Sequence, residues 1–371
     1  MRITIVQGPY FPVPPILGGA VEKTWFALGQ CFAAAGHEVV HLSRAHPSLP
    51  SSETIKGVLH HRTQGYDSPS SLKKSFLLDF LYTRRVIKML PPADIVVGNT
   101  FWFPILYRKP RKGLPYIHVA RFPKGQLKLF GRQSVLQTVS GAVRDAILAE
   151  APWAANRVPV IPNPLSSDYF RPVVAKRGKT LLYTGRVHPE KGLDLLLEAF
   201  GRSDAARTGW HLNIVGPHET RLGGGGDAYM ESLRRLAGSL PVSFMGATFE
   251  TERLLAHYDA ASIFIYPSIA DKGETFGLAP LEAMARACVP ICSDLGCFRD
   301  FLQEGQNGAI FDHRGSQRHA RLAACIDTLA SDEHARTQLA TQARKTAECF
   351  TLDRVARCYL DDFALRLGQP R

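Results

Sequence analysis

Short apolar runs alternate with amphipathic helical patterns along most of the chain, and this alternation restricts its possible fold more than any other feature. In the first half, the predicted strands are Arg2–Val6, Glu38–Leu42, Asp94–Gly98, Tyr116–Val119, Ser134–Val139 and Val158–Ile161. In the second half, they are Thr180–Thr184, His211–Val215, Val242–Met245, Ile263–Tyr266, Val289–Ser293 and Ala309–Phe311. Strands that alternate with helices form mainly parallel sheets covered by helices. The sequence therefore predicts an α/β protein with two βα units of similar size.

The boundary between the two units is predicted in a stretch rich in proline and charge. This stretch runs from Pro162 to about Gly178, and a new strand-type run begins at Lys179. We expect one Rossmann-like domain at residues 1–170 and a second at residues 171–351. A last helix, within residues 352–371, is expected to cross back to the first domain.

The charge of the chain is unevenly distributed. The net charge is +12 over 371 residues, and residues 1–172 hold 21 Lys and Arg against 9 Asp and Glu, so the second half is neutral. This asymmetry indicates an anionic partner for the first half, either a membrane surface, nucleic acid or a phosphorylated substrate. The seven cysteines have no disulfide or zinc spacing, and no apolar run nears the ~18 residues of a membrane span. We therefore expect a cytoplasmic protein.

The loop after the predicted strand Thr180–Thr184 combines two cations with glycines at the entrance of a helix. Residues 185–192 read GRVHPEKG, which places Arg186 and Lys191 five positions apart. In an open parallel sheet, ligands bind at the carboxyl ends of strands, where helix N-termini favour anions. A guanidinium and an ammonium group there suit a diphosphate, although a solvated turn with incidental charges would have the same pattern.

A second polar segment follows the predicted strand Ile263–Tyr266. Residues 273–285 read GETFGLAPLEAMA and hold two carboxylates, Glu274 and Glu282, eight positions apart. If a helix begins near Leu278, both acids can face one crevice. The amides at the helix entrance then point into it as anion donors, namely those of Phe276, Gly277 and Leu278. Buried-type neighbours argue against Glu282 lying on a solvated helix face.

Together these segments resemble glycosyltransferase family 4, a family of retaining enzymes with the GT-B fold that use nucleotide-sugar donors. The most specific match is E-x(7)-E followed by A-M-A, and GR-x(4)-KG matches the family's phosphate-binding cations. The Gly18-Gly19 turn matches the glycine-rich turn that approaches the donor diphosphate. Weaker matches, such as LNIVG at 212–216 and VSFMG at 242–246, extend the resemblance over essentially the whole chain in the same order.

The resemblance implies roles for the matching residues. Arg186 and Lys191 would bind the donor phosphates, Glu282 the ribose hydroxyls and Glu274 the transferred sugar, and His118 would face the sugar from the first domain. The implied donor-binding residues also include Gly18, Gly19, Gly185, Gly216, Phe276, Gly277 and Leu278. Residues 1–170 would then bind the acceptor and residues 171–351 the donor.

Two positions depart from the family pattern, and one segment is left without a role. Ala287 replaces a usual glycine, and Asp300 stands where a glutamate is common. These departures leave the donor open, with a UDP-sugar as first choice and GDP-mannose as alternative. The Gly223–Gly226 run suggests a flexible loop.

The chemistry expected of such a site is transfer of a hexose-type sugar with retention. The cations and helix N-termini predict electrostatic stabilisation of the departing phosphate. The resemblance implies front-face attack, with that phosphate accepting the acceptor's proton, on a glycan or lipid-linked acceptor in bacterial cell-surface polysaccharide or glycolipid synthesis. Many glycosyltransferases hold a metal with Asp-x-Asp, which this sequence lacks. We therefore expect neither a metal nor another cofactor.

Three other classes fit less well. A GT-B nucleotide-sugar epimerase would share the fold, but E-x(7)-E with a single GR-x(4)-KG favours transfer. No G-x-G-x-x-G follows the first strand, which disfavours a dinucleotide-dependent oxidoreductase. A nucleic-acid binder would explain the basic half but not the acids and glycines at the strand ends, so no nucleic acid is expected as partner.

The basic half suggests attachment to the inner face of the cytoplasmic membrane. As a helix, residues 72–90 place their basic side chains in one arc with Leu77 and Leu81, and we expect the opposite face to enter the core. That face comprises Leu72, Phe76, Phe80, Val86, Ile87 and Leu90. Asp79 falls on this apolar side and does not fit it. A second basic cluster lies at residues 108–112, and both clusters could also be solvated faces.

Overall fold

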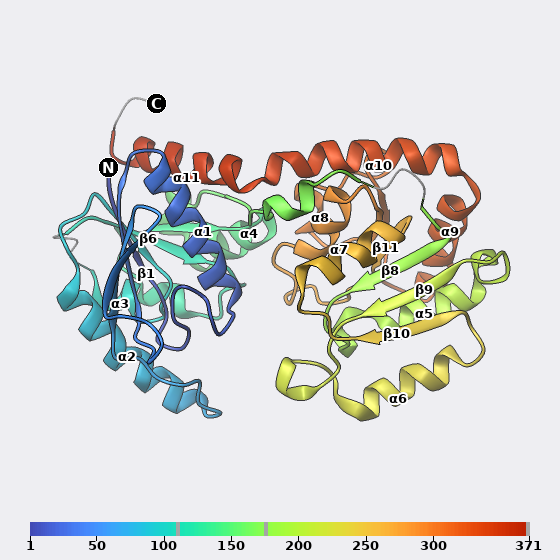
Figure 1. Cartoon of the computed structure of the whole chain (residues 1–371), viewed down its shortest axis with the longest axis horizontal. Helices are drawn as coiled ribbons and strands as arrows, with labels where there is room; N and C mark the ends of the chain where they lie inside the picture. Colours follow the sequence, from blue (N-terminus) through green and yellow to red (C-terminus); the bar gives the residue numbers. More distant parts are fainter. Residues whose placement is uncertain (109–111, 174–176, 369–371) are drawn as a thin grey trace. The chain divides into compact units, whose positions relative to one another are not determined.

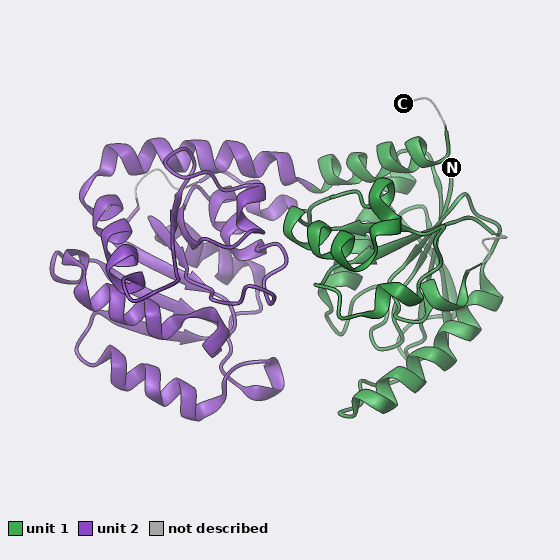
Figure 2. Ribbon diagram, turned by 180° about the vertical axis from the view of Figure 1, so that it is seen from behind, with its two compact units in different colours: residues 1–164, 352–371 green, residues 165–351 purple. Residues whose placement is uncertain are grey.

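The computed structural model describes residues 1–108, 112–173 and 177–368, which belong to two compact units (Figures 1 and 2). Unit 1 comprises residues 1–164 and 352–371, and unit 2 comprises residues 165–351. Unit 2 starts six residues before the boundary given by the sequence. The reason is that Leu165 forms a backbone bridge with Thr351, and the side chain of Tyr169 is buried.

Unit 1 is built on a seven-stranded sheet with the order β3-β4-β2-β1-β5-β6-β7, in which only the β3–β4 pair is antiparallel. The strands are β1 (Arg2–Val6), β2 (Glu38–Arg44), β3 (Ser52–Ile55), β4 (Val58–Thr63), β5 (Ile95–Gly98), β6 (Leu114–Val119) and β7 (Val135–Thr138). The prediction missed β3 and β4, because polar residues interrupt their apolar pattern. The predicted strand Val158–Ile161 is wrong, since only an isolated bridge joins Val160 to Thr138.

Helices cover both faces of this sheet. They are α1 (Ala20–Ala34), α2 (Leu72–Met89), α3 (Phe103–Leu106), α4 (Gly141–Glu150) and α11 (Leu352–Arg366). Along β1, Ile5 packs into the core under α1 and α11, whereas Val6 packs into the core under α2, α3 and α4. This alternation follows from the two-residue period of a strand. Both faces of the central strands are therefore apolar, as expected for a parallel sheet.

The last helix, α11, belongs to unit 1 (Figure 2) and packs against α1. Tyr359 and Phe363, one turn apart, are buried against Phe32 of α1, and Tyr116 of β6 donates a hydrogen bond to Asp362 at 3.0 Å. The expected return of the C-terminal helix to the first domain is therefore confirmed.

The orientation of α2 differs from the prediction. Leu72 and Phe76, expected in the core, are 78% and 44% exposed, whereas Asp79 is buried. Asp79 accepts hydrogen bonds from the Phe101 amide at 3.0 Å and from the Thr83 hydroxyl at 3.1 Å. These polar contacts, which the apolar pattern could not reveal, set the rotation of the helix. In the described ranges, no helix has the length and apolarity needed to cross a membrane.

Unit 2 repeats the parallel arrangement with a six-stranded sheet in the order β10-β9-β8-β11-β12-β13. The strands are β8 (Thr180–Thr184), β9 (His211–Val215), β10 (Val242–Gly246), β11 (Ile263–Tyr266), β12 (Val289–Ser293) and β13 (Ala309–Phe311). The helices are α5 (Leu193–Arg202), α6 (Gly226–Ala237), α7 (Thr251–Ala260), α8 (Leu278–Ala285), α9 (Arg318–Ser331) and α10 (Glu333–Ala347). The central neighbours β8 and β11 place the GRVHPEKG and GETFGLAPLEAMA segments at the same edge of the sheet.

Candidate active site

A buried ion pair joins the two polar segments of unit 2. The Lys191 ammonium group, at the end of the short helix η4 (Pro189–Lys191), contacts the Glu274 carboxylate in the loop after β11. The same carboxylate oxygen accepts hydrogen bonds from the Tyr266 hydroxyl at 3.0 Å and the Ser268 hydroxyl at 3.2 Å. Lys191 and Glu274 are only 7% and 8% exposed. Burial of a charged pair requires such additional hydrogen bonds, and here they hold Glu274 in one place.

The second cation, Arg186, is held by two acceptors at the surface of unit 2. Its Nη1 donates to the Gly223 carbonyl and its Nη2 to the Glu190 carboxylate, both at 2.6 Å. Its backbone is fixed as well, because the Tyr183 hydroxyl donates to the Arg186 carbonyl at 2.8 Å. Arg186 and Lys191 therefore flank one helix entrance, and each is paired with a carboxylate.

Glycines at this edge permit close approach of the backbones. Gly185 and Gly216 follow β8 and β9, and a side chain at Gly216 would overlap the Gly185 carbonyl. Gly277 has φ +96° and is the residue before α8, where a side chain would overlap Phe298. The next residue, Leu278, begins α8. The first backbone amides of α8, which have no acceptor within the helix, therefore follow Glu274 closely in the sequence.

Glu282 lies in α8 and is held by aromatic hydroxyl groups. The Tyr258 hydroxyl donates to Glu282 Oε2 at 2.8 Å and lies 2.7 Å from the Thr184 hydroxyl. Desolvation raises the pKa of Glu282, and hydrogen bonds from Tyr258 and Tyr169 oppose this rise. The carboxylate is therefore partly enclosed and anchored by two tyrosine hydroxyl groups.

The remaining predicted residues belong to unit 1. Gly18 and Gly19 have φ +86° and +94°, and Gly19 precedes α1, where a side chain would overlap Glu22. His118 lies at the end of β6, its Nδ1 2.6 Å from Gln137 Oε1 and its ring edge-on to Trp25. Desolvation lowers the pKa of His118, so its ring is neutral at pH 7.

The structure brings Lys191 into contact with Glu274, holds Arg186 and Glu282 through other residues, and thereby adds partners that sequence reasoning missed. Arg186, Lys191, Glu274 and Glu282 all lie in loops or helices that follow β8 and β11. The partners missed are Tyr169, Glu190, Tyr258, Tyr266 and Ser268. Tyr266 is the last residue of β11, and Ser268 lies in the loop that follows it. Their position at the carboxyl end of a strand could have identified them as candidate site residues. Tyr169 and Tyr258 come from distant segments and gave no such signal.

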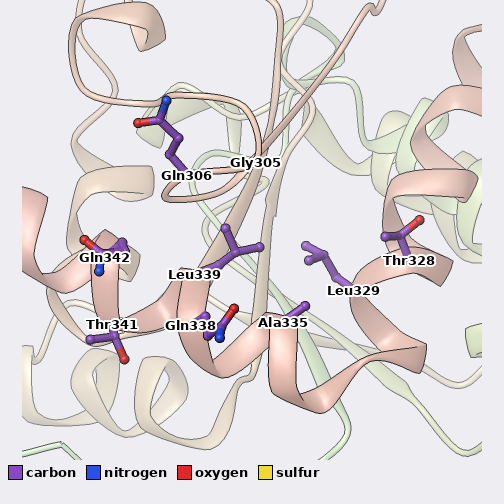
Figure 3. Close-up of a pocket in the computed structure, with 9 residues that line it drawn as sticks. All are labelled: Gly305, Gln306, Thr328, Leu329, Ala335, Gln338, Leu339, Thr341 and Gln342. Atoms are coloured by element: carbon purple, nitrogen blue, oxygen red, sulfur yellow. The ribbon is translucent and has the colours of Figure 1, made fainter.

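A cavity of about 630 Å³ lies elsewhere in unit 2 (Figure 3). It is formed by α9, α10 and the turn at Gly305 and Gln306, and Leu329 and Leu339 line it. None of its lining residues is titratable, and none is a predicted site residue. The cavity therefore offers no acid–base chemistry of its own.

Comparison with known proteins points to one family. The model of the family "Glycosyl transferases group 1" matches residues 168–346, which is almost all of unit 2. D-inositol 3-phosphate glycosyltransferase of Geodermatophilus obscurus is 30% identical over 53% of this chain and 45% of its own length. Phosphatidyl-myo-inositol mannosyltransferase of Mycobacterium leprae is 32% identical over 49% of this chain and 46% of its length. The chain thus spans about half the length of the curated relatives it matches.

Solved structures share the fold of the whole chain at low identity. Sucrose-phosphate synthase from Thermosynechococcus elongatus has a TM-score of 0.77 at 20% identity, covering 98% of this chain and all of the other. A HepE protein of Anabaena in complex with UDP has a TM-score of 0.73 at 15% identity, covering 98% of this chain and all of the other. The two Rossmann-like units with the returning C-terminal helix form the GT-B fold, which confirms the predicted fold class.

Proposed function

Because the chain belongs to the glycosyl transferases group 1 family, we propose that it is a retaining hexosyltransferase (EC 2.4.1.-). It moves a sugar from a nucleotide-sugar donor to a glycan or lipid-linked acceptor in bacterial cell-surface polysaccharide or glycolipid synthesis. The observation that carries this proposal is the buried contact of Lys191 with Glu274 at the carboxyl ends of β8 and β11, with Arg186, paired with Glu190, in the same loop as Lys191. Two cations beside a carboxylate suit a sugar joined to a diphosphate, because the leaving group is anionic and the sugar presents hydroxyl groups.

The proposed mechanism assigns each group one task. Arg186 and Lys191, with the amides at the start of α8, stabilise the diphosphate as the glycosidic bond breaks. Glu274 accepts hydrogen bonds from the sugar hydroxyls, and Glu282 holds the ribose hydroxyls from its position beside Tyr258. In the proposed front-face reaction, the acceptor's proton passes to the departing phosphate. His118 acts from unit 1 as a neutral, hydrogen-bonding ring.

A nucleotide-sugar panel tests the donor class. Thermal unfolding of the chain would be followed with UDP-glucose, UDP-N-acetylglucosamine, GDP-mannose and ADP-glucose. A cognate donor present at 100 times its Kd adds about 2.7 kcal/mol to the stability of the unit that binds it. We expect one donor to raise the unfolding temperature and the matching nucleoside monophosphate to raise it less. The proposal fails if no nucleotide sugar shifts the transition.

GDP-mannose is the second donor candidate. A UDP-sugar remains the first choice because solved neighbours of the same fold are described as complexes with UDP and with UDP-glucose. The alternative is favoured by the phosphatidyl-myo-inositol mannosyltransferases among the curated relatives. The same panel separates them, since only the cognate base gives the full shift.

We further propose that unit 1 works at the inner face of the cytoplasmic membrane through α2, as a peripheral contact. Leu72, Phe76, Leu77 and Leu81 of this helix are exposed, and its basic residues Lys73, Lys74, Arg84 and Lys88 are exposed as well. Exposed apolar side chains beside cations are what an interfacial helix requires. Of the second cluster, residues 109–111 lie outside the described residues. Arg108, the first residue of this cluster, donates to the Leu129 carbonyl at 2.8 Å.

Co-sedimentation with liposomes tests this membrane contact. We expect binding to vesicles with phosphatidylserine, weaker binding in high salt, and loss of binding when Lys73, Lys74, Arg84 and Lys88 become Ser. A matched control replaces four exposed basic residues of unit 2 (Arg202, Arg207, Arg234 and Arg253), which should leave binding unchanged. Equal recovery in the supernatant with anionic and neutral vesicles would contradict the proposal and favour a soluble acceptor.

A further inference from the structure

Four consecutive glycines, Gly223–Gly226, lie between β9 and α6 and take no part in the chemistry described so far. The first follows the short helix η6 (Thr220–Leu222), and the last begins α6. This loop reaches the GRVHPEKG segment after the neighbouring strand β8. There the Gly223 carbonyl accepts the hydrogen bond from Arg186 Nη1 at 2.6 Å. The loop is thus one of the two acceptors that fix the guanidinium group.

Backbone hydrogen bonds tie the loop to the turn that carries Arg186. The Val187 amide donates to the Pro217 carbonyl at 2.9 Å, and the Gly225 amide donates to the Val187 carbonyl at 2.8 Å. Across the loop, the Gly226 amide donates to the His218 carbonyl at 2.7 Å. These bonds hold residues 217–226 against the residue that follows Arg186. The Gly223 carbonyl is therefore presented from a fixed backbone.

The packing around the loop requires glycine at several positions. A Cβ on Gly223 would lie 3.1 Å from Cδ and 3.2 Å from Nη1 of Arg186, in a backbone with φ +80°. A Cβ on Gly224 would overlap the backbone of His218, and one on Gly225 would lie 2.8 Å from the ring of Tyr229. At Gly223 the nearest atoms to the added Cβ all belong to the Arg186 side chain, whereas at Gly224–Gly226 the nearest atoms belong to other residues. The absence of side chains thus lets the loop backbone lie directly against Arg186.

We propose that Gly223, held in place by the backbone of this loop, is the positioning residue for Arg186 in the diphosphate site, an inference that rests on the proposed function. An arginine side chain loses considerable rotamer entropy when it is immobilised, and fixing it before the ligand arrives lowers the cost of binding. A guanidinium has five N–H donors, and the loop and Glu190 engage one nitrogen each, so donors remain for phosphate oxygens. Gly223 thus acts on the diphosphate through Arg186.

The test compares glycine substitutions that differ in what their new side chain meets. Gly223→Ala places a methyl group against Arg186. Gly226→Ala has a similar φ, +82°, but its nearest neighbour is the Thr220 hydroxyl at 3.2 Å. Gly223→Asn adds the same Cβ with a residue that tolerates positive φ, so it separates displacement of Arg186 from backbone strain. Isothermal titration with inorganic pyrophosphate, UDP and GDP gives Kd, and circular dichroism checks the fold of each variant.

We expect Arg186→Ala to raise the Kd for pyrophosphate at least tenfold. Gly223→Ala and Gly223→Asn should each raise it three- to tenfold. The control Gly226→Ala should change it less than twofold. In an Arg186→Ala background, Gly223→Ala should add less than twofold, because its effect passes through that side chain. A purely structural role would give equal losses in both backgrounds and would overturn the inference. So would a folded Gly223→Asn variant with wild-type Kd.

The proposed function and this inference fail in different ways. If wild-type protein binds neither pyrophosphate nor a nucleoside diphosphate, or if Arg186→Ala binds as the wild type does, the diphosphate site itself is misplaced. If Arg186→Ala loses binding and Gly223→Ala does not, the site stands and the role of the loop is refuted.

Discussion

Because Lys191 and Glu274 form a buried ion pair, removing one of the two charges should destabilise unit 2 by nearly as much as removing both. Lys191→Met leaves a buried carboxylate without a counter-charge, although the hydroxyl groups of Tyr266 and Ser268 still donate to it. Breaking a buried ion pair by removing one partner costs about 3–5 kcal/mol. Because the two hydroxyl groups remain, we expect the lower end, about 3 kcal/mol. Glu274→Gln leaves the buried ammonium with the face of Tyr266, 5.5 Å from the ring centroid, and should cost about as much.

The double variant Lys191→Met/Glu274→Gln removes both charges, so no isolated buried charge remains. Its loss should be smaller than the sum of the single losses by about 2 kcal/mol, within the range found for contacting residues. Hydrogen–deuterium exchange of peptides from β8 and β11, measured across a urea series, reports the unfolding free energy of unit 2. Additive losses, within about 0.5 kcal/mol, would refute the view that these two groups form one electrostatic unit.

Three further outcomes can be checked with the same protein. Glu282→Gln should raise the Kd of the cognate nucleotide, which titration measures. Glu274→Gln should mainly lower kcat in steady-state kinetics, because its contact with the sugar matters most as positive charge develops on that sugar in the transition state. Burial beside Arg62 lowers the pKa of His60 to about 4, below the ordinary 6.5. As the pH drops from 6.5 towards 4, His60 is therefore protonated in the unfolded chain before it is protonated in the folded one. This difference lowers the stability of the fold by about 2 kcal/mol at pH 5. In urea unfolding at pH 8 and pH 5, His60→Leu should reduce the stability lost between the two pH values by about 2 kcal/mol, and an unchanged loss would contradict this reasoning. Activity should survive EDTA, and loss that Mn²⁺ or Mg²⁺ restores would show that a metal is required.

The sequence predicted secondary structure best where the apolar residues followed a single clear pattern. Apolar runs of four to six residues between helical patterns predicted most strands of both sheets, because a buried parallel strand is apolar on both faces. Strands β3 and β4 were missed because β4 carries His60, His61 and Arg62, which break that pattern. These side chains are accommodated by tertiary contacts, such as the stacking of His60 on His41, that no local pattern encodes.

The candidate site was predictable in its charges but not in their pairing. Spacing placed Arg186, Lys191 and Glu274 near one sheet edge, yet it could not show that Lys191 and Glu274 form a buried pair. The same limit explains the error in α2. The helical spacing of its apolar residues predicted Leu72 inside. The hydrogen bond from the Phe101 amide, just before α3, to Asp79 instead orients the helix so that Leu72 is exposed.

The most direct test of the account is the stereochemistry of the sugar after turnover. The donor selected by the panel, labelled with ¹³C at the anomeric carbon, would be incubated with the protein and a mixture of lipid and oligosaccharide acceptors, and NMR would follow that carbon. The account predicts release of the nucleoside diphosphate and a new glycosidic bond with the anomeric configuration of the donor. Release should be lost in the Arg186→Ala variant. A product of inverted configuration, or a sugar that stays on the nucleotide with an altered ring stereocentre, would contradict it.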